Sequence, residues 1–384
     1  MVRYPYFWKA DDGLTHPFYN IILKMGKEQY STVIIGAGQA GLSAAYYLSK
    51  INDDFIVLDE ASRPGDSWRK RWDSLRLFTP AQHDGLPGLP FPAKRGALPT
   101  KDEMADYLSD YVGKFSLNVQ SDTKVSALKK TSEGYEVETS RGKFYADHVI
   151  VATGTNPHAY IPAFASEIDK SIAQIHSSKY KNPQSFPGTQ TLVAGAGTSG
   201  VEIAIELSES RPTLISGRGT PHIPDFIFRY FGRPYWWFAH NILTLKTPIG
   251  RKVGPIIKSS GGPLISVSMQ EVKEAGVEQL PRVKGVQDGK PQLEDGRILS
   301  VDSIVWATGY KPDFSWIKLE VTDASGWPET NRGLSKKFAG LYFVGMMFQY
   351  GLTSGLVGGV GRDAAFVVNH LRKMKHQVLP TGGA

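Results

Sequence analysis

Two segments of this chain repeat one plan, a short β-branched strand followed by a glycine-rich turn and a helix. Ser31–Leu48 reads STVIIGAGQAGLSAAYYL, and Thr191–Leu207 reads TLVAGAGTSGVEIAIEL. Both have G-x-G-x-x-G spacing, with Gly36, Gly38 and Gly41 in the first copy and Gly195, Gly197 and Gly200 in the second. In such a turn the first glycine permits the tight bend, the second lets the backbone approach a pyrophosphate, and the third allows close helix packing. The repeat predicts an α/β fold with two Rossmann-like dinucleotide-binding domains.

The residue that follows the second strand differs between the two copies. FIVLD ends at Asp59, and TLIS leads to Arg218, at the same distance from the first glycine of its copy. A carboxylate accepts hydrogen bonds from ribose hydroxyls and repels a 2′-phosphate, whereas arginine pairs with that phosphate. We therefore expect FAD in the first unit and NADPH in the second, with NADH still possible. Glu60 is the alternative to Asp59, and the alternative for Arg218 is a solvated loop arginine.

Each unit closes with a strand that runs into Ala-Thr-Gly, at residues 152–154 and again at 307–309. A further apolar strand at 341–345 and a glycine-rich turn that opens a helix follow the second unit. Because they follow it, we expect them to return to the first domain, which makes the second domain an insertion. The expected division is an N-terminal extension at 1–30, an FAD-binding domain at 31–157 and 311–384, and an NAD(P)H-binding domain at 158–310.

The composition excludes several kinds of functional site. The absence of cysteine excludes disulfide scaffolds, thiolate metal sites and a redox dithiol, and we expect no metal site. The net charge of +7 is scattered along the chain, so it indicates a small anionic ligand rather than nucleic acid. The sequence has no apolar run long enough to span a bilayer and no secretory signal, so we expect a cytoplasmic protein without a transmembrane segment.

Six blocks in order resemble the flavin-containing monooxygenase family, especially its compact bacterial members. They are VIIGAGQAG, GDSWRKRWDSLRLFTP, VIVATG, VAGAGTSGVE, VWATGYKPDF and GLYFVGMMFQYGLTSGLVGGVGRDAA, and the match extends from Thr32 to about His370. The resemblance implies FAD, NAD(P)H, molecular oxygen and a small-molecule substrate, with a homodimer possible. Its implied reaction forms a flavin C4a-hydroperoxide and transfers one oxygen atom to a nitrogen, sulfur or activated carbon centre. The alternatives are an NADPH oxidase or reductase without oxygen insertion and a nucleotide-binding redox sensor.

The motifs and the resemblance together imply the cofactor-binding residues. Around the first unit they are Gly36, Gly38, Gln39, Ala40, Gly41, Asp59, Glu60, Ser67, Trp68, Arg69, Thr79, Gln82, Val125, Ala152, Thr153 and Gly154. Around the second they are Gly195, Gly197, Thr198, Ser199, Gly200, Arg218, Ala307, Thr308 and Gly309, with Leu352 and Thr353 further along the chain. Because the flavin performs the chemistry, no catalytic residue is assigned, and the candidates beside it are Thr79, Gln82, Gln349 and Tyr350. Packing is the alternative role for Trp68, Trp72, Gln349 and Tyr350.

The sequence also departs from the family. Its linker signature is half present, since His176 and Tyr180 stand in place but Lys170 and Ile172 replace Phe and Gly. Tyr180 is typical of the heteroatom-oxygenating branch, and His176 is either functional or a hydrogen-bonding tie for the linker. Asp66 replaces a glycine before Ser-Trp and brings a carboxylate near the expected cofactor.

The sequence also allows predictions about the placement of two further segments. A helix N-terminus at Leu352–Ser354 is expected to face the flavin, and Gly358, Gly359 and Gly361 suit a helix end pressed against that ring. Residues 222–239 are unusually aromatic and show no clear helical stripe. They form either a substrate mouth, a patch on a membrane surface that includes Arg229 and Arg233, or a folded excursion that buries its rings.

Overall fold

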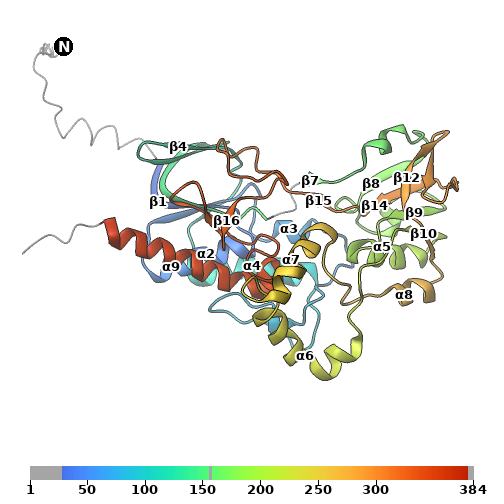
Figure 1. The fold of residues 1–384 in the computed structure, drawn as a ribbon, viewed down its shortest axis with the longest axis horizontal. Helices are drawn as coiled ribbons and strands as arrows, with labels where there is room; N and C mark the ends of the chain where they lie inside the picture. Colours follow the sequence, from blue (N-terminus) through green and yellow to red (C-terminus); the bar gives the residue numbers. More distant parts are fainter. Residues whose placement is uncertain (1–27, 155–157, 379–384) are drawn as a thin grey trace, which may run out of the picture.

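The computed structural model describes residues 28–154 and 158–378, which form two lobes (Figure 1). None of the helices within these ranges is long and apolar enough to cross a membrane. The expected extension at 1–30 lies largely outside the described residues. Its last three residues belong to the first strand, β1 (Glu28–Ile35), so they are part of the sheet.

The first lobe is built on a nine-stranded sheet whose core path is β16-β17-β18-β6-β1-β2-β3. Its central strands, β1, β2 (Phe55–Leu58), β3 (Val119–Gln120), β6 (Gly142–Val151) and β18 (Leu341–Phe343), pair in parallel. Antiparallel strands complete the sheet, namely β4 (Val125–Thr131), β5 (Gly134–Thr139), β16 (Thr330–Asn331) and β17 (Leu334–Ser335). Because β18 pairs with β6, the chain returns to this sheet after building the second lobe.

Alternation along the central strands divides the first core into two layers. Ile34, Val57 and Ile150 point to the face covered by α2 (Gln39–Lys50), α4 (Lys101–Phe115) and α9 (Val360–Val378). Val33 and Val149 point to the opposite face, where β4 and β5 pack. The short helices α3 (Asp66–Arg69) and η1 (Ala81–His83) lie in the segment that links β2 to α4.

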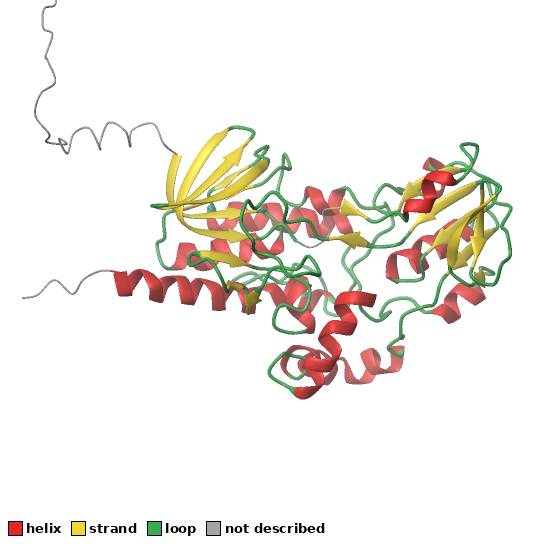
Figure 2. Ribbon diagram, turned by 45° about the horizontal axis from the view of Figure 1, so that its top comes forward, coloured by secondary structure: helices red, strands yellow, loops and turns green. Residues whose placement is uncertain are grey.

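The second lobe has a five-stranded parallel sheet in the order β11-β10-β9-β14-β8. The strands are β8 (Ala173–His176), β9 (Thr191–Ala194), β10 (Thr213–Ser216), β11 (Glu278–Leu280) and β14 (Ser303–Trp306). Helices α5 (Thr198–Ser208) and α8 (Met269–Glu274) pack on it, and β12 (Val283–Gln287) pairs with β13 (Lys290–Leu293). Figure 2 shows the two sheets at opposite ends of the molecule.

Two connections between the lobes pair with each other, because β7 (His158–Ala159) is antiparallel to β15 (Tyr310–Lys311). The chain also passes between the lobes before α6 and after α7. Short 3-10 turns complete the second lobe at η2 (Ala163–Glu167) and η3 (Pro183–Ser185). Trp72 shows that the lobes also share side chains. It follows α3 in the first lobe, yet it is buried in the core of the second, with Tyr180 and Phe186. Its role is packing across the junction.

The aromatic segment is helical, although its sequence shows no clear stripe. It forms α6 (Asp225–Asn241), which bends where Phe231 has non-helical angles of φ −122° and ψ 21°, shortly before Pro234. The proline and the bend explain why a single helical period is not visible in the sequence. Helix α7 (Pro248–Ser260) follows and is drawn above α6, which lies at the lower edge of the molecule in Figure 1.

Candidate functional site

The first glycine turn leaves an open cradle at the start of α2. Gly36 has φ of +106°, and a Cβ on it would lie 2.6 Å from the carbonyl oxygen of Ala152. A Cβ on Gly41 would lie 1.8 Å from the carbonyl oxygen of Gly36, so both positions require glycine. At Gly38, in contrast, no atom of the described chain lies within 4 Å of that position. No side chain of the described residues caps α2, so the N–H groups of Gln39 and Ala40 face this space, which suits an anion.

The second turn repeats the geometry. Gly195 has φ of +117°, and its Cβ would lie 2.3 Å from the carbonyl oxygen of Ala307, while a Cβ on Gly200 would lie 1.9 Å from that of Gly195. The Cβ position of Gly197 again meets no described atom within 4 Å. Within the described chain α5 has no side-chain cap, which leaves the N–H groups of Thr198 and Ser199 to a ligand.

In each unit, the strand that runs into Ala-Thr-Gly is hydrogen-bonded to the strand that precedes the glycine turn. The N–H of Ala152 donates to Ile35 and that of Ala307 donates to Ala194, each at 2.8 Å. Gly154 and Gly309 have φ of +73° and +82°, so each strand ends in a turn that favours glycine. Thr153 and Thr308 therefore lie next to the cradle of their own unit.

Asp59 is held at the end of β2 beside the first cradle. Its carboxylate accepts hydrogen bonds from the backbone N–H groups of Ala37 and Ala61. Burial raises the pKa of Asp59, and the two amides act in the opposite direction. Glu60 is exposed and lies 3.9 Å from Lys124, so the geometry favours Asp59 as the ribose-facing acid. Val125 begins the strand just after Thr123, whose N–H donates to the carbonyl of Asp59.

Arg218 occupies the matching place in the second lobe with a different environment. It follows Gly217, whose N–H donates to Leu280 and whose φ is +128°. The Arg218 side chain is exposed, and no ion pair or hydrogen bond holds its guanidinium within the part of the chain described. The group is therefore available to an external phosphate.

The segment Ser67–Arg69 is connected to α4 through the side chain of Arg69. Arg69 donates to Asp66 at 3.1 Å and to Asp106 at 2.7 Å, which ties α3 to α4. Burial would raise the pKa of Asp66, but the Arg69 and Ser62 hydrogen bonds outweigh it and lower that pKa. The carboxylate that departs from the family pattern is thus already paired. Trp68 packs partly buried against the first core.

A cavity of about 720 Å³ brings together three distant parts of the chain. Thr79 and Gln82 line it from the loop around η1, Thr353 and Leu356 from the segment before α9, and Trp236 from α6. Gln82 accepts a hydrogen bond from Gly96, which leaves its amide N–H groups for a ligand. Thr353 is bound to His240, with 3.1 Å between Oγ1 and Nδ1.

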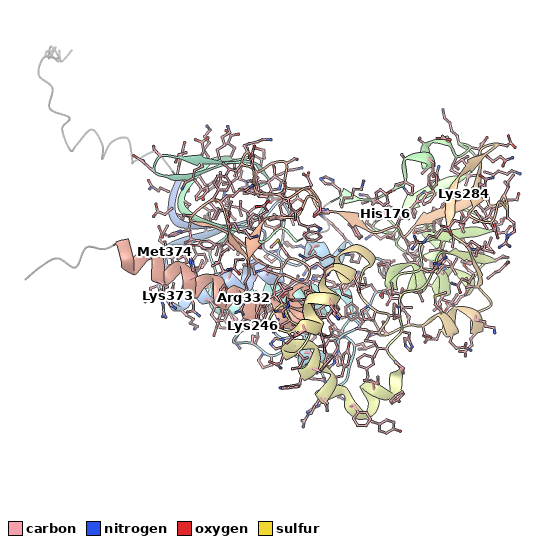
Figure 3. The ribbon with its side chains drawn as sticks, viewed as in Figure 1. His176, Lys246, Lys284, Arg332, Lys373 and Met374 are labelled. Atoms are coloured by element: carbon pink, nitrogen blue, oxygen red, sulfur yellow. The ribbon has the colours of Figure 1, made fainter. Side chains whose placement is uncertain are left out.

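Gln349 and Tyr350 lie apart from this cavity. Gln349 lines a separate pocket of about 250 Å³, and its buried Nε2 finds no partner among the described residues. Tyr350 lies between two guanidinium groups, 3.9 Å from that of Arg332 and 4.6 Å from that of Arg362. This cation–π arrangement gives Tyr350 a packing role. Figure 3 shows Arg332 close to Lys246, beside α7.

The structure corrects where the last helix begins. Leu352–Gly355 (η4) and Val357–Gly359 (η5) are 3-10 turns, and the continuous helix α9 begins at Val360. The glycines there accommodate protein atoms. A Cβ on Gly358 would lie 1.8 Å from the carbonyl oxygen of His83, and one on Gly361 would lie 2.7 Å from Pro87. Close packing on the η1 loop therefore explains these glycines.

Asp84 is a residue that the sequence analysis missed. It is fully buried directly behind the cavity wall, where it accepts a hydrogen bond from the Thr79 hydroxyl. Burial raises the pKa of Asp84 to about 7, and its Oδ2 has no partner among the described residues. The surrounding sequence, QHDGLPG, is typical of an exposed turn and contains no signal that could have indicated burial.

His176 joins the lobes, as Figure 3 shows. Its Nε2 lies 2.9 Å from the carbonyl of Gly309, and its Nδ1 accepts from the N–H of Ser178 at 3.1 Å. Both ring nitrogens are thus used by the linker, and burial lowers the pKa of His176, which favours the neutral ring. Tyr180 is buried and donates to Glu206 at 2.9 Å.

The fold and its two open cradles define a class, the oxidoreductases that use flavin and nicotinamide cofactors. A model of the pyridine nucleotide-disulphide oxidoreductase family matches residues 33–215. A flavin-containing monooxygenase from Stenotrophomonas maltophilia superimposes with a TM-score of 0.75 and 27% identity, covering 90% of this chain and 99% of that one.

Sequence relatives narrow the class. An uncharacterized CzcO-like oxidoreductase from Geobacillus kaustophilus is 37% identical over 88% of this chain and 97% of the relative. The indole-3-pyruvate monooxygenase YUCCA1 of Oryza sativa is 30% identical over 79% of this chain and 81% of the relative. The chain belongs to the flavin-containing monooxygenase family and is a flavin-dependent oxidoreductase.

Proposed function

We propose that this enzyme binds FAD and NADPH and transfers one oxygen atom from O2 to a nitrogen, sulfur or activated carbon centre of a small substrate. The observation that carries the proposal is the pair of matched glycine cradles with opposite side chains at their edges. The carboxylate of Asp59, held by two backbone amides, suits a ribose, and the exposed guanidinium of Arg218 suits a 2′-phosphate.

We assign FAD to residues 31–157 and 311–384 and NADPH to residues 158–310. The N–H groups of Gln39 and Ala40 would hold the FAD pyrophosphate, and those of Thr198 and Ser199 would hold that of NADPH. The remaining cofactor contacts of the proposal are Ser67 and Trp68 on α3, Val125 at the start of β4, and the residues after β6 and β14, namely Ala152, Thr153, Gly154, Ala307, Thr308 and Gly309.

When bound, FAD supplies hydride acceptance and oxygen activation. The protein's part is to orient the ring and keep water away from it. Thr79, Gln82 and Thr353 present polar groups toward the cavity, and Leu86, Leu356 and Trp236 supply the apolar wall. The wall favours a dry site, in which a reactive oxygen species is protected from proton exchange with solvent.

A second function stays open because of the linker. His176 uses both ring nitrogens within the protein, and half of the family linker signature is absent, which favours an oxidase or a reductase that releases peroxide. The redox-sensor alternative requires that NADPH reduces the flavin poorly or not at all.

The test is an electron balance on the purified holoenzyme. NADPH consumption, O2 consumption and hydrogen peroxide release are measured with and without a panel of amines, thioethers and ketones. A monooxygenase lowers the peroxide released per NADPH when its substrate is present, and the oxygenated product accounts for the difference. Peroxide equal to NADPH under every condition would replace the proposal with an oxidase, and failure of NADPH to bleach the flavin would replace it with a sensor.

A further inference from the structure

Helices α6 and α7 carry most of the exposed apolar surface of the described residues. Eight of the eleven exposed large hydrophobic side chains lie between residues 226 and 256. Five of them are aromatic and belong to α6, namely Phe226 (55% exposed), Tyr230 (71%), Phe231 (55%), Trp237 (61%) and Phe238 (38%). Single exposed apolar residues are ordinary, but such a cluster indicates a surface that binds another molecule or a membrane.

The exposed rings of α6 lie on both sides of its bend at Phe231, with Phe226 and Tyr230 before the bend and Trp237 after it. Trp236, in contrast, is buried against His83, with 5.3 Å between the ring centroids. Helix α6 therefore packs on the protein through Trp236 and leaves its exposed rings, which we call the aromatic face, outside.

Helix α7, which follows α6 in the chain, also leaves apolar side chains exposed. Its inner side contains glycines, and a Cβ on Gly250 would lie 2.0 Å from the carbonyl oxygen of Thr244, while one on Gly254 would lie 3.0 Å from Phe348. This tight inner contact leaves Ile249 52% exposed and Leu245, just before the helix, 41% exposed.

The charged residues of the segment that forms α6 and α7 are mostly basic. The sequence from Asp225 to Ser260 contains six lysines and arginines and a single acid. Arg233, Arg251 and Lys252 are exposed, and none of them forms an ion pair with a described residue. Exposed Trp, Tyr and Phe rings flanked by unpaired bases are the composition of a helix that lies in the interface of an anionic bilayer. A second copy of the same face would bring like charges together, which disfavours a dimer here.

Helix α6 also forms one wall of the large cavity. Arg233, Trp237 and Asn241 are exposed on α6 and line the 720 Å³ cavity at the same time. We propose that α6 and α7 dock the protein on an anionic membrane surface, with the aromatic face among the lipid headgroups and the cavity mouth opening toward the bilayer.

The test is vesicle binding by the full-length holoprotein, which requires no turnover and so stands apart from the proposed reaction. Flotation is compared between vesicles of phosphatidylcholine alone and vesicles that also contain phosphatidylglycerol. We expect binding only to the anionic vesicles and release as salt is raised, because screening weakens the attraction. Equal recovery with both vesicle types, or none with either, would overturn the proposal.

Matched variants locate the surface. Arg251→Glu/Lys252→Glu should weaken partitioning at least about tenfold, since each base near an anionic surface contributes strongly. Arg372→Glu/Lys373→Glu makes the same charge change in an exposed pair near the end of α9 and should bind like the parent protein. Lys373 is labelled at the left of Figure 3. Equal loss in both variants would show nonspecific attraction and contradict a defined docking surface.

A further double variant, Phe226→Ser/Tyr230→Ser, tests the contribution of the aromatic side chains to membrane binding and leaves the cavity wall intact. It should keep the circular dichroism and flavin spectra of the parent and still lose vesicle binding. If this variant instead converts a dimer to a monomer in sedimentation velocity while vesicle binding is unchanged, the aromatic face is a contact between copies and the membrane proposal is wrong.

Discussion

The two glycine turns have nearly the same backbone but face different surroundings. In both, the first and third glycines are forced by carbonyl oxygens at about the same positions, and the second faces open space. Beyond the second strand the units diverge, because Asp59 is fixed by two backbone amides whereas Arg218 has no partner among the described residues. The backbone thus supplies a common anion cradle, and in our proposal one side chain at the edge of each cradle distinguishes FAD from NADPH.

The largest effect is expected from filling the third glycine position. Gly41→Ala and Gly200→Ala each place a Cβ less than 2 Å from a backbone oxygen, so each should cost about 3 kcal/mol or more of unfolding free energy. Thermal unfolding of the apoproteins measures this cost. If the two glycine turns have the same geometry, both variants are destabilised. An unchanged unfolding free energy in one variant would show that its turn has a different backbone geometry.

The second glycine position separates binding from folding. Gly38→Ala and Gly197→Ala meet no described atom, so the apoproteins should unfold within about 0.5 kcal/mol of the parent. Gly38→Ala should lower FAD affinity about tenfold or more, and Gly197→Ala should raise the KM for NADPH while the flavin is retained. Flavin content after gel filtration and steady-state kinetics distinguish the two. Loss of flavin from Gly197→Ala would contradict our assignment of ligands to the two lobes.

The side chains at the cradle edges provide the next test. Arg218→Ala should raise the KM for NADPH about 30-fold, equivalent to about 2 kcal/mol, because the charge-assisted pair with the 2′-phosphate is lost. The KM for NADH should hardly change. Asp59→Asn should weaken FAD and leave both nicotinamide constants unaffected, and Arg372→Ala is a matched control at an exposed arginine. Equal rises for NADPH and NADH in Arg218→Ala would exclude the phosphate role.

The smallest expected effect concerns the buried acids of the two lobes. Burial raises the pKa of Asp84 and of Glu202 to about 7, from ordinary values near 4. A folded-state pKa above the unfolded one stabilises the protein at low pH, and that contribution is lost as pH rises through about 7.

Asp84→Asn should therefore flatten the fall in stability between about pH 4 and about pH 7, by about 1 to 2 kcal/mol. Glu202→Gln should do so less, because the pKa of Glu202 rises from 4.5 whereas that of Asp84 rises from 3.8. Chemical denaturation across pH measures both. A larger effect at Glu202 would reverse this part of the comparison.

The sequence predicted the two nucleotide units well because their signals are local. Strand, turn and helix occupy neighbouring residues, and each glycine is required by contacts with the same unit or the strand beside it. Gly36, Gly38 and Gly41 and their counterparts lie where the spacing places them. The half-present linker signature was also informative, since His176 forms the hydrogen-bonding tie that was one of its two expected roles.

Other features depended on residues far apart in the chain, and no local pattern encodes such contacts. Trp72 leaves its own lobe for the core of the other, Gly358 packs on His83, and Tyr350 is enclosed by two arginines. The pKa of Asp84 depends on burial by segments that fold over the η1 loop. Sequence alone was sufficient for the cofactor cradles, because short-range backbone geometry makes them. Tertiary packing decided the cavity wall, the buried acids and the exposed aromatic face, because burial is a property of the whole assembled chain.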